Sequence, residues 1–144
     1  MGGPAMIEGG GLGIYTPEEV GPMSFQVPNG VVDILVEDEA EAVRVAKQYL
    51  SYFQGSVDTW EAPDQRKLRH VVPENRLRLY DMREIIATVA DIDSVLEVRA
   101  GFGVGVITCF IRVEGRPMGV IANNPHHLAG AIDSDAADKG TRFI

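Results

Sequence analysis

The clearest hydrophobic pattern along the chain predicts a helix over residues 38–53. Apolar side chains recur at helical spacing from Ala42 to Phe53, while charged and amide side chains take the other side. Asp38 and Glu41 resemble a capping box at its start. Gly55 follows as a stop signal, so this segment is expected to be one amphipathic helix.

Three further helix starts are marked by polar residues. Thr16 and Glu19 enclose a proline and predict a short helix that Gly21 ends. Asp81, together with Glu84, is expected to cap a second long helix that presents Ile85, Ile86 and Val89. Asp133 or Ser134 is expected to cap a last helix, whose crowded aspartates suit its free N–H groups and dipole.

Short apolar runs predict strands over 31–36, 95–98, 106–113 and 118–122. The last two are separated by a turn of two residues at 114–115, which indicates a hairpin. Both hairpin strands are apolar at successive positions, a pattern typical of strands that are buried on both faces. We therefore expect the single cysteine, Cys109, to be a buried core thiol rather than a nucleophile or a disulfide partner.

Charge and composition narrow the functional classes. The chain has 144 residues and a formal net charge of -8, which disfavours nucleic acid as a partner. No stretch approaches the length of a membrane span, and the first residues do not resemble a signal peptide, so a cytoplasmic protein is expected. Residues 57–80 lack a period and read as a linker. They carry a basic stretch, which is either a solvated face or an attraction for an anion such as the phosphates of coenzyme A: Arg66, Lys67, Arg69, His70, Arg76 and Arg78.

The sequence motifs do not predict a catalytic group or a metal site. The glycine clusters at 9–13 and 101–105 lack the strand before and the helix after that phosphate loops require, which favours tight packing or turns. His126 and His127 are adjacent and lack a third ligand at suitable spacing, so a zinc site is not expected. A hydrogen bond within the loop is the simpler role for His127 or its neighbour. No Ser-His-Asp or Cys-His arrangement is supported.

The last third of the chain carries the most specific pattern. The run EGRPMGVIANNP at 114–125, followed by HLAGAIDSDAADKGTRF at 127–143, resembles the carboxyltransferase (beta) subunits of biotin-dependent acyl-CoA carboxylases of the propionyl- or acetyl-CoA type. The segments 2–13, 72–75 and 80–86 also fall where that family has them, in the same order. The resemblance therefore covers nearly the whole chain.

This resemblance implies an α/β fold of crotonase/ClpP-like ββα units. Residues 1–56 would be the C-terminal part of a first crotonase-like half, 57–80 a linker, and 81–144 the N-terminal part of a second half. In the family, the glycine-rich turns that hold both oxyanions lie before Gly2 and after Ile144 in this numbering, so the chain is expected to be a central fragment that is inactive alone.

The resemblance also implies a function and its partners. The complete enzyme moves a carboxyl group from carboxybiotin to an acyl-CoA, with biotin carried on a biotin carboxyl carrier or biotin carboxylase subunit and not bound covalently here. Substrate-binding residues are expected in the loop of Asn123, Asn124, Pro125 and His127, and no catalytic or metal-binding residue is assigned. Apolar faces left without neighbours would favour a homo-oligomer. Two other functions stay open: a crotonase-like acyl-CoA hydratase or decarboxylase, and a non-catalytic assembly module.

Overall fold

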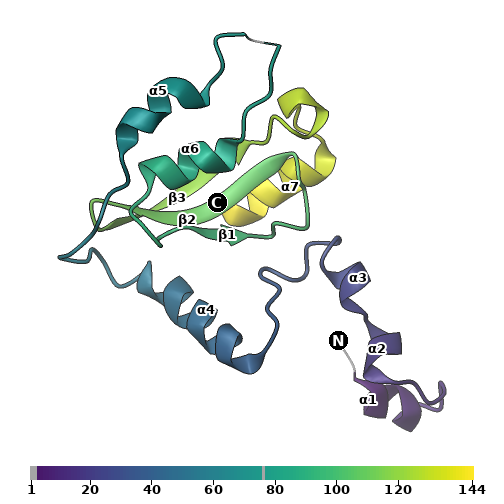
Figure 1. Cartoon of the computed structure of the whole chain (residues 1–144). Helices are drawn as coiled ribbons and strands as arrows, with labels where there is room; N and C mark the ends of the chain where they lie inside the picture. Colours follow the sequence, from purple (N-terminus) through teal and green to yellow (C-terminus); the bar gives the residue numbers. More distant parts are fainter. Residues whose placement is uncertain (1–2, 76) are drawn as a thin grey trace.

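Strand β2 (Val106–Val113) is the centre of the fold and its most buried element. A computed structural model describes residues 3–75 and 77–144, so Met1, Gly2 and Arg76 of the motifs above lie outside the described residues. In it, β2 pairs antiparallel with β1 (Leu96–Val98) on one side and with β3 (Arg116–Asn123) on the other (Figure 1). The predicted hairpin is thus confirmed.

The hairpin turn uses two residues in the left-handed region. Glu114 has φ +51° and Gly115 has φ +75°, which is the arrangement that lets a two-residue turn follow the twist of the strands. The carboxylate of Asp91 accepts hydrogen bonds from the backbone N–H of Glu114 at 3.0 Å and of Gly115 at 2.7 Å. A Cβ at Gly115 would lie 2.3 Å from the carbonyl oxygen of Val57, so glycine is required there.

Neighbouring residues of β2 face opposite sides of the sheet. On one side, helix α6 (Met82–Val89) covers a core formed by Ile86, Ala90, Ile107, Cys109 and Ile111. Cys109 is fully buried, as predicted, and burial raises the pKa of its thiol to about 11. The cysteine is therefore a thiol at neutral pH and fills space in the core.

On the other side, Phe110 lies among aromatic rings from two helices. Tyr49, Tyr52 and Phe53, at the end of helix α4 (Glu39–Ser51) and just beyond it, have ring centroids 5.5–5.6 Å from that of Phe110. Phe143 of helix α7 (Ser134–Phe143) is 5.0 Å away. Both helices were predicted, and Asp38, Asp81 and Asp133 cap α4, α6 and α7 with their side chains.

Arg112 joins the end of α4 to the hairpin. Its guanidinium donates hydrogen bonds to the carbonyl oxygens of Ser51 at 2.7 Å, Gly55 at 3.0 Å and Gly115 at 2.8 Å. The same group lies 5.3 Å from the ring centroid of Tyr52, and the hydroxyl of Tyr52 donates to the carbonyl oxygen of Ser94. Arg112 is buried although charged, because main-chain acceptors satisfy it.

Two strand predictions need correction. Residues 31–36 form no strand: the segment has irregular structure beside α4 and is paired with no strand of the described residues. The prediction that β3 is buried on both faces is also wrong, because β3 is an edge strand and five of its eight residues are exposed. In an antiparallel edge strand, residues whose main-chain groups bond to the neighbouring strand alternate with residues whose main-chain groups face outward. In β3 the outward-facing residues are Pro117, Gly119, Ile121 and Asn123. The missing N–H of Pro117 suits such an edge.

The remaining segments are short helices and turns. The predicted linker contains a 3-10 turn η1 (Gln65–Lys67) and helix α5 (Leu68–Val71). The N-terminal part has α1 (Pro4–Gly9), α2 (Pro17–Val20) and α3 (Met23–Gln26), which lie apart from the sheet (Figure 1). Among the described residues, no helix is long and apolar enough to cross a membrane.

The glycine cluster at 101–105 packs tightly, as expected. A Cβ at Gly101 would lie 2.3 Å from Cγ1 of Val27, and one at Gly103 would lie 2.5 Å from the carbonyl oxygen of Asp135. The cluster therefore lets the chain between β1 and β2 approach both the N-terminal segment and α7 closely.

Candidate functional site

The loop from Asn123 to Asp133 joins the end of β3 to the start of α7 and contains all four predicted site residues. It also includes the 3-10 turn η2 (Leu128–Gly130). The structure brings this loop against the glycine cluster: a Cβ at Gly105 would lie 3.0 Å from Cδ2 of His127 and 3.2 Å from Cβ of Ala136. The loop is thus held by the sheet at one end and by α7 at the other.

Asn124 fixes the first half of the loop from inside. Its backbone N–H donates to the carbonyl oxygen of Gly105 at 2.8 Å, and its side-chain amide donates to that of Val104 at 2.9 Å. The side-chain oxygen accepts from the backbone N–H of His126 at 3.2 Å. Asn124 and the following Pro125 are both buried, so their side chains shape the loop from within.

His127 fixes the second half through an acidic partner. Its Nε2 lies 2.7 Å from Oδ2 of Asp133, while Oδ1 of Asp133 accepts from the backbone N–H of Ala136 at 2.9 Å. The hydrogen bond from Ala136 and then that from His127 hold the pKa of Asp133 below its usual value. An ionised carboxylate can only accept, so Nε2 donates this hydrogen bond, and in the neutral ring Nδ1 then has the lone pair. The predicted hydrogen bond within the loop is confirmed for His127.

Between these two anchors the backbone runs through three left-handed residues. Leu128, Ala129 and Gly130 have φ values of +45°, +55° and +89°. Residues other than glycine rarely adopt this region, and such residues persist where the surrounding structure holds them. A Cβ at Gly130 would lie 2.7 Å from Nδ2 of Asn123. The turn therefore folds back over Asn123 and presents Leu128, which is 64% exposed, to solvent.

The polar groups that the loop offers to a ligand are few. Asn123 is exposed, and His127 is partly exposed with Nδ1 forming no hydrogen bond to any described residue. Together they supply one amide and one ring nitrogen beside an exposed leucine. Within residues 3–75 and 77–144, no three His, Cys, Asp or Glu side chains are grouped in a way that could hold a metal ion. The basic side chains Lys67, Arg69, His70 and Arg78 are exposed elsewhere, and Arg66 pairs with Asp64 at 2.7 Å.

Sequence reasoning found the loop but missed how it is held. Asp133 was read as a helix cap, and the structure shows that its second oxygen also orients His127. A spacing of six residues between a histidine and an N-cap aspartate was the available signal. The left-handed residues Leu128 and Ala129 had none, since neither is a residue type that favours positive φ.

Comparison with known proteins shows one family. The family model described as the carboxyl transferase domain matches residues 3–144 of the sequence. The beta4 subunit of a biotin-dependent long chain acyl-coenzyme A carboxylase from Mycobacterium tuberculosis is 34% identical over 138 residues, which cover 88% of this chain and 26% of that subunit.

Solved structures give the same result. A single-chain, multi-domain long-chain acyl-CoA carboxylase matches 99% of this chain with 61% identity and a TM-score of 0.93, over 15% of its own length. The transcarboxylase 12S hexamer, with hydrolysed methylmalonyl-coenzyme A bound, matches 99% of this chain with 31% identity and a TM-score of 0.78, over 30% of its own length. The chain thus spans less than a third of each of these relatives.

Proposed function

The chain belongs to the carboxyl transferase domain family, and from this we propose that it serves the transfer of a carboxyl group from carboxybiotin to an acyl-CoA. The observation that carries the proposal is the 61% identity with an acyl-CoA carboxylase over 99% of this chain. The α/β fold is the crotonase-like fold of the carboxyltransferases, and its hairpin of β2 and β3 followed by α7 is one ββα unit. A hydratase is not favoured by these relatives.

Long-chain acyl-CoA is the substrate class that we propose. Two relatives with substantial identity, the mycobacterial beta4 subunit and the single-chain carboxylase, are described as acting on long-chain acyl-CoA. This differs from the propionyl- or acetyl-CoA type indicated by the sequence pattern. The exposed leucine of the loop, Leu128, is compatible with an apolar acyl group nearby.

Within the site, we assign contact with acyl-CoA to Asn123 and His127. Asn123 offers an amide, and Nδ1 of His127 accepts a hydrogen bond because Asp133 keeps the proton on Nε2. Asn124 and Pro125 take part by holding the loop in place. The enolate of the acyl-CoA and the ureido oxygen of biotin each need a pair of hydrogen-bond donors, and Asn123 and His127 do not form two such pairs. We therefore assign no step of the transfer from biotin to these two residues.

The proposed partners follow from the same relatives. Biotin would be carried by a biotin carboxyl carrier or biotin carboxylase subunit, as the relatives described as biotin-dependent indicate. A homo-oligomer is supported by the hexamer of the transcarboxylase 12S structure. We also propose that residues 1–56 and 81–144 belong to two crotonase-like halves joined by 57–80. The segment between α4 and α6 contains only the short helical elements η1 and α5, which supports that division.

A segment exchange in a carboxylase tests the proposal. Residues 3–144 replace the equivalent segment of the single-chain long-chain acyl-CoA carboxylase, and transfer of radiolabelled carboxylate to long-chain acyl-CoA is measured. We expect transfer by the chimera, and none by the 144-residue chain alone, since loss of one oxyanion donor already costs about 10²–10³ in rate. A chimera that folds, assembles and carries biotin but transfers nothing would refute the proposal.

Matched variants of the chimera test the assigned residues. His127→Ala removes the proposed hydrogen bond to acyl-CoA together with the bond to Asp133 that holds the loop, and should lower kcat/KM for acyl-CoA at least about two- to tenfold. His126→Ala is the control, because His126 is adjacent and exposed and its side chain has no hydrogen bond among the described residues. Equal effects of the two substitutions would remove His127 from the site.

A further inference from the structure

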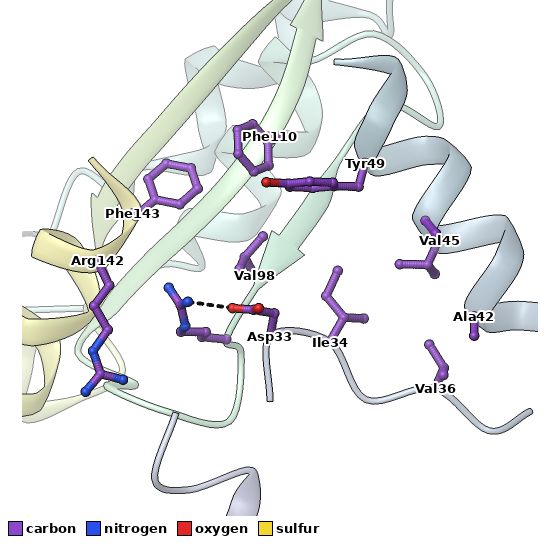
Figure 2. Close-up of a pocket in the computed structure, with 12 residues that line it drawn as sticks. Asp33, Ile34, Val36, Ala42, Val45, Tyr49, Val98, Phe110, Arg142 and Phe143 are labelled. Atoms are coloured by element: carbon purple, nitrogen blue, oxygen red, sulfur yellow. Dashed lines mark ion pairs between the residues drawn. The ribbon is translucent and has the colours of Figure 1, made fainter. Parts of the chain in front are cut away.

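A separate cavity lies at the other end of α7 from the loop just described. It has a volume of about 510 Å³, is open to solvent on one side, and is lined by Asp33, Ile34 and Val36, by α4, by the sheet and by the end of α7 (Figure 2). Most of its wall is apolar, formed by Ile34, Val36, Ala42, Val45, Phe110 and Phe143. This volume is in the range of pockets that enclose a small ligand.

The charged groups of the wall are gathered away from α4. Figure 2 shows Arg142 on the side of the cavity opposite Ala42, with Asp33 between them. Arg99 pairs with Asp33 at 2.6 Å. Arg142 has no carboxylate partner among the described residues: it donates to the carbonyl oxygen of Gly30 at 3.4 Å and lies 5.1 Å from the ring centroid of Phe102. The cavity wall thus holds two guanidinium groups and one carboxylate, which pairs with Arg99, in a chain whose net charge is -8.

A third cation is buried on α7, although it does not line the cavity. Lys139, one turn before Phe143 on α7, is 0% exposed, and its Nζ has no hydrogen-bond partner among the described residues. Nε of Arg99 is the other buried polar side-chain atom without a partner there. Burial lowers the pKa of Lys139, the carboxylate of Glu97 opposes this shift, and the guanidinium groups of Arg83 and Arg99 add to it. A buried ammonium group without a hydrogen-bond partner is rare, since leaving it unpaired is costly.

We propose that this cavity binds a long-chain fatty acid, with the carboxylate at Arg142 and Arg99 and the hydrocarbon chain directed toward Ala42 and Val36 on the α4 side. The charge complementarity selects an anion, and guanidinium groups suit a carboxylate in particular because they bind both of its oxygens. The apolar wall selects an unbranched chain over a small polar acid. This binding does not depend on the proposed carboxyl transfer, so either can fail without the other.

A chain-length series at pH 8 tests the hydrocarbon part. Octanoate, decanoate, dodecanoate and tetradecanoate are titrated into the 144-residue chain by calorimetry, below the concentrations at which they form micelles. Affinity should rise by up to about fourfold for each methylene, which corresponds to burial of one CH₂, and should level off once the cavity is full. No detectable binding, or affinity that does not change along the series, overturns the proposal.

Two adjacent residues of α4 give a matched pair. Ala42→Asp places a carboxylate in the wall of the cavity, whereas Val43→Asp places one on the same helix outside it, and both positions are exposed in the free chain. We expect Ala42→Asp to weaken dodecanoate binding at least about tenfold, because it adds a like charge and a polar group to the apolar wall, and Val43→Asp to leave binding unchanged. Circular dichroism establishes that both variants fold. Equal affinity of the two variants overturns the location.

The head group is tested by removing its charge. Dodecanol in place of dodecanoate should bind about tenfold more weakly, since hydrogen bonds to charged groups contribute more than neutral ones. Arg142→Gln should weaken dodecanoate to a similar extent without changing dodecanol, and Arg44→Gln, on the exposed side of α4, should change neither. If dodecanol binds as well as dodecanoate, or if only dodecanoyl-CoA binds, the carboxylate is not the group recognised.

Discussion

Single carboxylates hold the two bends of the chain that flank β3. Asp91 accepts hydrogen bonds from both residues of the hairpin turn, and Asp133 accepts from both Ala136 and His127. Each aspartate uses one oxygen for each donor, so replacement by an amide removes one acceptor and introduces a second donor where a donor already points. These two positions are therefore expected to be sensitive to a change of only one atom.

Asp91→Asn should lower the free energy of unfolding by about 1–3 kcal/mol, because a buried backbone N–H of the turn loses its acceptor. Asp93→Asn is the control: Asp93 is exposed and has φ +59°, where asparagine is equally suited. Urea unfolding followed by circular dichroism measures both. Equal stability of Asp91→Asn and the unchanged chain would show that the turn does not depend on this carboxylate.

Asp133 should make the stability of the folded chain depend on pH. Hydrogen bonds from Ala136 and His127 hold the pKa of Asp133 in the folded chain below the usual 3.8. A lowered pKa stabilises the folded state at pH values above 3.8, and this contribution is lost as pH falls toward and through the folded pKa. The urea midpoint should therefore fall less between pH 6 and pH 3 in Asp133→Asn than in Asp135→Asn, an exposed neighbour in the same helical turn. Parallel curves for the two variants would contradict this.

At the scale of elements, local signals were sufficient for the capped helices and for the hairpin, but not for every strand or for the exposure of β3. The capped starts at Asp38, Asp81 and Asp133 were predicted from sequence, because a cap and a helical period act within a few residues. Residues 31–36 have the composition of a strand, yet a strand exists only where another strand pairs with it. The apolar residues of β3 suggested two buried faces, but its exposure is decided by its position at the edge of the sheet.

The same distinction applies to the candidate site. The loop at 123–127 was predicted from its pattern, and a hydrogen bond of His127 within the loop was expected from its surroundings in sequence. Asn124 could not be recognised as an internal anchor, because its partners Val104 and Gly105 are far away in the sequence. The cavity beside α4 was also not predicted, since its wall combines four segments separated in the chain.

At the scale of the whole molecule, exposed apolar residues are widespread. Phe25, Leu77 and Ile121 are 71%, 92% and 46% exposed, and the outer edge of β3 has main-chain groups that face away from β2. Exposed apolar surface costs about 25 cal/mol for each Å² that could be buried, and open sheet edges pair with other chains. These features favour association with another protein surface or with a second copy.

Self-association of the chain is therefore expected at micromolar concentration. Sedimentation velocity should show species larger than a monomer of 15.6 kDa. Ile121→Lys should shift the distribution toward monomer, because a charge on an edge strand opposes strand pairing, whereas Thr141→Lys on the exposed side of α7 should not. A single compact monomer at all concentrations would indicate that these surfaces do not self-associate.

The hydrogen bonds of Arg112 also set an order of events in folding. Two of these bonds join residues that are separated by 57 and by 61 positions in the sequence, whereas the hairpin joins residues that are close in sequence. Contacts between distant residues form only after the chain has lost the entropy of closing the long loop between them. Helix α4 contains no buried residue of its own, so its attachment depends on this guanidinium and the aromatic rings near Phe110. The hairpin and α6 should thus protect their amide hydrogens from exchange first, and α4 should detach and exchange more readily than they do while the sheet stays closed.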